Sequence, residues 1–171
     1  MKILLSGLLL GALAWQASAT PSPAVVNACL RTVSGAPSVR YTPMATDAFQ
    51  VTEDAEAGKT DITMRIGPDT VGTWEVAKTH AFGFVLNGRE IPLARVIRLD
   101  KRKVPAAFNP YEAIWGEAQA GNKAYICATF NFDGLGKSGS FQSVRGVYLI
   151  ERSAHEGATF YTSGNTAVSE K

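Results

Sequence analysis

Residues 82–93 read Phe-Gly-Phe-Val-Leu-Asn-Gly-Arg-Glu-Ile-Pro-Leu, and this stretch indicates the fold class more clearly than any other part of the chain. Asn87-Gly88 lies between two apolar arms. Both residues tolerate the positive φ angles of a type I′ turn, so the stretch predicts a β-hairpin. Pro92 has no N–H to donate to a sheet ladder, which places the return arm at a sheet edge or at a bulge.

A two-residue period extends from this hairpin in both directions. Ile62, Met64 and Ile66 alternate with polar residues, as in a strand with one buried face. Residues 124–132 and 141–152 are rich in aromatic and β-branched residues, and they predict a second hairpin around a glycine-rich loop. Phe160-Tyr161 predicts one more short strand.

Two segments have helical spacing instead. In residues 23–33 the apolar residues recur every three or four positions; Ser22 can cap this helix, and Gly35 is a stop signal. Residues 109–120 resemble a second helix that starts at Asn109-Pro110 and ends at Gly121. The predicted fold is therefore mainly β, of the α+β class. It is an antiparallel sheet or a partly open barrel with one or two short helices packed on it.

Residues 1–19 have the three parts of a secretory signal peptide. Lys2 is followed by an apolar run, and Ala17-Ser18-Ala19 supplies the small residues of a cleavage site. The run is shorter than the roughly 20 residues that cross a bilayer. We therefore predict an exported protein, periplasmic or extracellular, with a globular β-rich domain at residues 20–162, a flexible tail at 163–171 and no membrane span in the mature chain.

Cys29 and Cys127 are the two cysteines of the chain. An exported protein meets an oxidising environment, which favours a disulfide between them. Neither cysteine has the closely spaced second ligand of a metal site, so no metal is predicted.

Several kinds of chemistry lack their motifs. The formal net charge of +2 gives no bulk signature of nucleic-acid binding. The hydrolase motifs G-x-S-x-G and H-E-x-x-H do not occur, and no cofactor is expected. Gly136-Lys137-Ser138 matches the end of a phosphate-binding loop, but Asn131 stands where its first glycine belongs, so a hairpin loop is favoured.

Charge is distributed unevenly along the chain. Residues 47–61 carry five acids and one lysine, a net of −4, whereas residues 89–103 carry six basic and two acidic residues, a net of +4. The basic segment is either a charged edge strand that resists aggregation or a site for an acidic partner. The candidate binding residues there are Arg95, Arg98, Lys101 and Arg102.

Other candidates lie further along the chain. Trp115 is the aromatic residue that we expect to be exposed as a binding anchor. The glycine-rich loop contributes Asp133, Lys137 and Ser138 as candidate binding residues.

The interpretation that we favour is a small exported binding or inhibitory module that engages a protein or a cell-envelope ligand. One alternative is an exported enzyme with a dispersed site around His80 or His155, since the members of a triad need be close only in space. Another alternative is a structural subunit of an envelope assembly.

Overall fold

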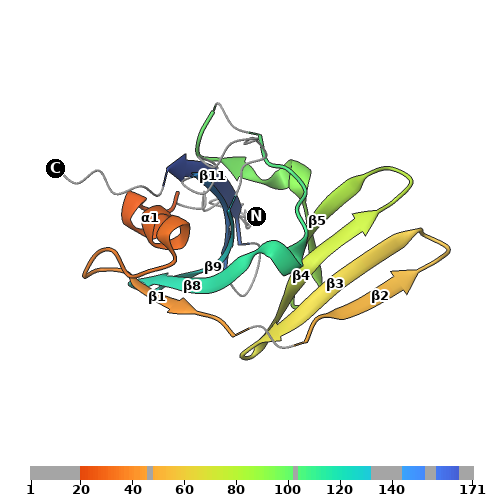
Figure 1. Ribbon diagram of the computed structural model, residues 1–171, viewed down its shortest axis with the longest axis horizontal. Coiled ribbons are helices and arrows are strands. Elements are labelled where there is room, and N and C mark those ends of the chain that lie inside the picture. The colour runs from red at the N-terminus through yellow and green to blue at the C-terminus, as the bar shows by residue number, and fades with distance from the viewer. Residues whose placement is uncertain (1–19, 46–47, 102–103, 132–143, 153–156, 166–171) are drawn as a thin grey trace, which may run out of the picture.

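The structure is a computed structural model that describes residues 20–45, 48–101, 104–131, 144–152 and 157–165. The predicted signal peptide lies outside these residues. The described residues form three layers: one α-helix, a six-stranded sheet and a five-stranded sheet (Figure 1). The mainly β fold, largely antiparallel with a short helix packed on it, confirms the predicted class. No helix within the described residues is long and apolar enough to cross a membrane.

The six-stranded sheet is the middle layer. Its strands, in spatial order, are β1 (Arg40–Pro43), β8 (Ile114–Ala120), β9 (Lys123–Phe130), β10 (Val144–Glu151), β11 (Thr159–Asn165) and β7 (Ile97–Arg98). Its pairs are antiparallel except for β11 with β7. β9 and β10 confirm the second predicted hairpin. The short strand predicted at Phe160-Tyr161 is longer than expected, because β11 continues through Asn165 into the segment assigned to the tail.

The five-stranded sheet is an antiparallel meander. Its strands, in spatial and chain order, are β2 (Gln50–Asp54), β3 (Lys59–Ile66), β4 (Asp69–Val76), β5 (Ala81–Leu86) and β6 (Arg89–Pro92). The β5–β6 turn confirms the hairpin prediction, since Asn87 and Gly88 have φ angles of 52° and 77°. In addition, the Asn87 side-chain oxygen accepts a hydrogen bond from the Thr70 N–H at 2.8 Å, which ties this turn to β4.

Helix α1 (Pro23–Arg31) covers the outer face of the six-stranded sheet. Ser22 caps it by accepting a hydrogen bond from the Val25 N–H at 3.4 Å, as the sequence predicts. The helix ends before Gly35, because Thr32 takes the left-handed conformation with a φ of 58°. Its buried face packs into one of the two apolar cores.

The predicted disulfide between Cys29 and Cys127 is present. It joins α1 to β9, the Cα atoms are 5.5 Å apart, and both cysteines are fully buried. The alternation of side chains along β9 explains how the disulfide can reach the helix. Cys127 points to the helix layer, while its neighbours Ile126 and Ala128 point into the core between the two sheets.

The second predicted helix is wrong. Residues 110–112 form only a single 3-10 turn, η2 (Pro110–Glu112), and the chain then enters β8 between β1 and β9. Gly116 makes this packing possible, because a Cβ at that position would lie 2.1 Å from the Tyr41 hydroxyl oxygen. Glycine also disfavours a helix interior. Pairing on both sides of β8 therefore outweighs the helical spacing of its apolar residues.

Candidate functional site

Three of the predicted basic candidates lie at one edge of the six-stranded sheet. Arg95 ends the 3-10 turn η1 (Leu93–Arg95), Arg98 belongs to β7, and Lys101 follows that strand. All three are exposed and form no ion pair with a described residue. β7 is an edge strand, as required by the interpretation that the basic segment is a charged edge that resists aggregation. Arg102 lies outside the described residues.

These basic side chains are not gathered around one hollow. Arg98 lines a shallow depression with Leu93, Ala94, Val96, Val104 and Pro105. Arg95 lines a different one, which it shares with Arg89 and Glu90. The basic edge is thus a charged margin and not a single enclosed site.

Trp115 is not the exposed anchor that we predicted. It is 2% exposed in the core between the sheets, and its indole N–H donates to the Pro110 carbonyl oxygen at 3.1 Å. The error follows from the incorrect prediction of a helix at residues 109–120. Trp115 instead lies in β8, where its side chain points into the core between the sheets. Asp133, Lys137, Ser138 and His155 lie outside the described residues. His80 lies in the turn before β5, is exposed and has a φ of 53°.

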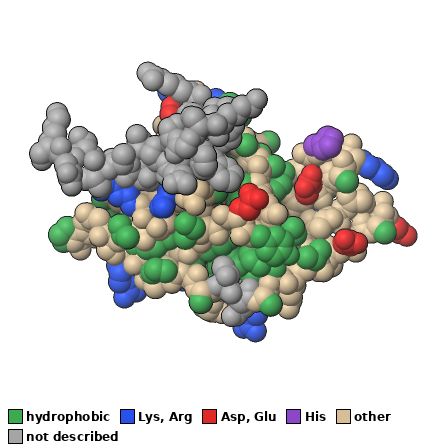
Figure 2. Space-filling view, in the orientation of Figure 1, with side chains coloured by type: hydrophobic (Ala, Val, Ile, Leu, Met, Phe, Trp, Pro, Cys, Tyr) green, Lys and Arg blue, Asp and Glu red, His purple; other side chains and the backbone are tan. Residues whose placement is uncertain are grey.

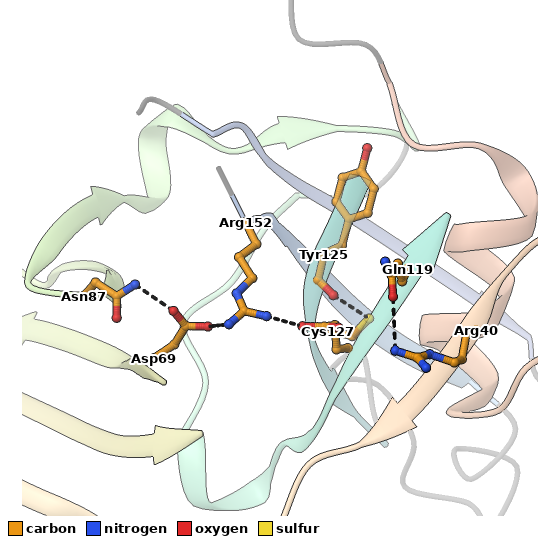
Figure 3. A network of polar contacts seen from close by, with 8 residues as sticks. Arg40, Asp69, Asn87, Gln119, Tyr125, Cys127 and Arg152 are labelled. Atoms are coloured by element: carbon orange, nitrogen blue, oxygen red, sulfur yellow. Dashed lines mark hydrogen bonds and ion pairs between the residues drawn. The ribbon is translucent and has the colours of Figure 1, made fainter. Parts of the chain in front are cut away.

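A cluster of short ion pairs joins the two sheets. The Arg152 guanidinium, just beyond β10, contacts Asp69 of β4 at 2.5 Å and Glu117 of β8 at 2.6 Å. Asn87 donates to the other Asp69 oxygen at 2.8 Å (Figure 3). One arginine bonds both carboxylates and balances one of their two negative charges, so this cluster is suited to holding the sheets together. Among the described residues, no group of three or more His, Cys, Asp or Glu side chains could hold a metal ion.

A groove that the sequence did not reveal lies on the inner face of the five-stranded sheet, where the segment 107–110 passes beside it. It has a volume of about 330 Å³. Its lining combines sheet residues with that segment: Thr60, Ile62, Thr73, Glu75, Phe82, Ala107, Phe108, Asn109 and Pro110. Around the junction of the two sheets, Figure 2 shows hydrophobic side chains gathered at the surface, and Tyr111 and Ile114 are 50% and 37% exposed.

Strand register explains which side chains face the groove. Residues directly opposite each other in neighbouring strands share a face of the sheet. One row across β2, β3, β4 and β5 is therefore Glu53, Thr60, Glu75 and Phe82, and the next is Val51, Ile62, Thr73 and Phe84. In the second row, Phe84 and Thr73 are buried, Ile62 is half-buried, and Val51 is 53% exposed. The six-stranded sheet thus covers only part of this face.

The wall of the groove is held in place by aromatic packing. Phe108 stacks on Phe130 and Tyr148, with ring centroids 5.1 and 5.4 Å away. The Tyr148 hydroxyl accepts from the Ala106 N–H at 2.9 Å and donates to the Ala106 carbonyl oxygen at 2.5 Å. Because Tyr148 is fully buried, these contacts fix the segment before η2 against the sheet.

The uncovered part of the inner face is acidic. Neither Glu53 nor Glu75 forms an ion pair with a described residue. The nearby Lys59 does not neutralise them, since its strand position puts it on the other face, where it contacts Glu90 and Asp61 at 2.8 and 2.9 Å. Those hydrogen bonds raise the pKa of the Lys59 ammonium. The groove therefore has apolar side chains beside one carboxylate, Glu75, and Glu53 lies in the same row of the sheet just outside the lining.

The architecture is a helix packed on two stacked sheets. Compared with known proteins, the chain matches no family model, no curated protein and no solved structure.

Proposed function

We propose that this protein is an exported binding module that engages a protein ligand through the groove of the five-stranded sheet. The observation that carries the proposal is the groove itself, because its size lies in the range of about 300–1,000 Å³ typical of ligand sites and its wall is preformed. The buried disulfide supports export, since such bonds persist in oxidising compartments.

The chemistry of the groove favours one class of ligand. Ile62, Phe82 and Phe108 offer apolar surface, so an apolar side chain gains free energy by leaving water there. Glu75 and Glu53 stand beside that surface without an ion-pair partner in the described parts of the chain, and they attract a cation. The ligand that fits both features is an extended protein segment in which a lysine or arginine accompanies an apolar residue.

Two capped peptides with the same apolar residues, one with lysines and the other with glutamates, test this proposal. Binding to the mature protein is followed by NMR chemical shifts. We expect the lysine peptide to bind and to perturb Thr60, Ile62 and Glu75. The glutamate peptide should bind more weakly, and added salt should reduce the difference in affinity between the two peptides.

Matched variants localise the binding. Glu75→Gln should weaken the lysine peptide by about two- to fivefold, as expected from the loss of about 0.5–1 kcal/mol for one exposed ion pair. Glu56→Gln makes the same change in charge in the exposed β2–β3 turn, away from the groove lining, and should leave affinity unchanged. Equal effects of the two variants, or shifts confined to the basic edge, would show that the groove is not the site.

A further inference from the structure

The two sheets have four edge strands, and they differ in their ability to accept another strand. β1 and β6 have four residues each and end in Pro43 and Pro92, while β7 has two residues. Proline cannot donate a ladder hydrogen bond, and a very short edge offers few. β2 has five residues without proline, so it is the longest and least protected edge.

β2 is also open to solvent. All five of its residues are exposed, and it lies at the outer margin of the five-stranded sheet with β3 on one side only (Figure 1). Within the described part of the chain, its backbone pairs with β3 alone. Every second residue of an edge strand directs its N–H and C=O groups away from the sheet, so these groups of β2 are available to a partner.

We infer that the protein ligand of the proposed function adds an extended strand to the free edge of β2. This inference rests on the proposed function and names the way in which the ligand binds. Val51 and Glu53 project from β2 on the groove face. An incoming strand therefore places an apolar or β-branched side chain beside Val51 and a basic one beside Glu53, and its backbone completes the ladder.

Charge argues for a basic partner rather than a second copy of this chain. β2 ends in Glu53 and Asp54, and the Asp54 carboxylate accepts hydrogen bonds from the N–H groups of Glu56 and Ala57 in the following turn. Pairing two copies of β2 would bring four carboxylates to one short ladder, and like charges destabilise strand pairs. A lysine-bearing strand meets no such repulsion.

The strand and the groove are separate parts of the same binding face. An added strand lies about 4.8 Å beyond β2. The groove is lined by residues of β3, β4 and β5, further into the sheet. Residues that flank the added strand in the partner fill the groove, so blocking the ladder and altering the groove are distinguishable perturbations.

The experiment compares the capped lysine peptide with two N-methylated twins. One twin carries N-methyl groups on the odd-numbered backbone nitrogens, and the other carries them on the even-numbered ones. The methyl groups remove ladder donors and leave every side chain in place. We expect the twin whose ladder-facing nitrogens are blocked to bind about tenfold more weakly or worse. Amide exchange in alternate residues of β2 should slow when the unmodified peptide binds.

Charge exchange gives a second, independent measurement. Glu53→Lys should weaken the lysine peptide and strengthen the glutamate peptide, whereas the control Glu56→Lys, in the turn beyond β2, should change both much less. If both N-methyl twins bind as well as the parent and β2 amides exchange unchanged, strand addition is wrong while groove binding stands. If no peptide binds, the proposed function fails as well. Concentration-dependent dimers that protect β2 would identify a second copy as the occupant and overturn the inference.

Discussion

Replacing Arg152 with methionine should destabilise the protein more than the loss of any exposed arginine. Arg152 contacts both Asp69 on one sheet and Glu117 on the other. The side chains of Asp69 and Glu117 are only 8% and 17% exposed. Methionine keeps much of the length of the side chain and removes its charge, so the two carboxylates lose their partner while the packing of the stem is largely kept.

The magnitude follows from this burial. Breaking a fully buried ion pair by removing one partner costs about 3–5 kcal/mol, because a charge is left unpaired in the interior. The Arg152 side chain is 31% exposed, so water can reach part of the site and the cost is smaller. Asn87 also still donates to Asp69 at 2.8 Å. We therefore expect a loss of about 2–3 kcal/mol.

Urea denaturation followed by circular dichroism measures this loss. The matched control is Arg40→Met, since the Arg40 guanidinium bonds Gln119 at 3.1 Å on the exposed surface and should matter by less than about 0.5 kcal/mol (Figure 3). A triple variant, Asp69→Asn, Glu117→Gln and Arg152→Met, removes all three charges and should recover most of the stability. If Arg152→Met costs no more than Arg40→Met, the cluster does not hold the sheets together.

Two further predictions concern the covalent link and the buried phenols. Cys29→Ala combined with Cys127→Ala should lower the free energy of unfolding, measured in urea, by about 4–5 kcal/mol. The disulfide spans a separation of 98 residues, and releasing so long a loop adds entropy to the unfolded chain. A loss below about 1 kcal/mol would contradict this account. Burial raises the pKa of Tyr41 and Tyr125 above the ordinary 10.0. As the pH rises, these tyrosines therefore ionise first in the unfolded chain, which stabilises the unfolded state. Their contribution to stability is complete below about pH 10 and is lost above it. Unfolding measured from pH 8 to pH 11 should show this decline, and Tyr125→Phe should make it shallower; an unchanged slope in that variant would count against the explanation.

Local chemistry accounts for the features that could be predicted from the sequence. Asn87-Gly88 specifies its turn through two backbone angles, and Ser22 caps a helix through its own side chain, so neither depends on distant residues. The disulfide was predictable because the chain has two cysteines and because residues 1–19 have the pattern of a signal peptide, which predicts an oxidising environment. These signals were enough to predict the fold class and the approximate ends of several strands.

The groove and the fate of Trp115 depended instead on long-range packing. Residues 109–120 fit a helix by spacing, and the pairing of β8 with strands on both sides makes residues 114–120 extended. The groove needs the segment 107–110 to lie beside β3, β4 and β5, which no local pattern encodes. The acidic segment 47–61, with its net charge of −4, was a signal in the sequence, but no local pattern connects its Glu53 with Glu75 of β4.

The way in which the layers cover one another supports placing the proposed binding site on the five-stranded sheet. Both faces of the six-stranded sheet are occupied, one by α1 and the disulfide and the other by the core between the sheets. Its side chains are therefore committed to stability. The inner face of the five-stranded sheet is covered where its core residues pack, and it becomes open toward Val51 and Glu53. The core residues are Met64, Ile66, Val71, Phe84, Leu86 and Ile91. Substitutions at this uncovered margin leave the core unchanged, so the surface can be adapted to a partner without weakening the fold that supports it.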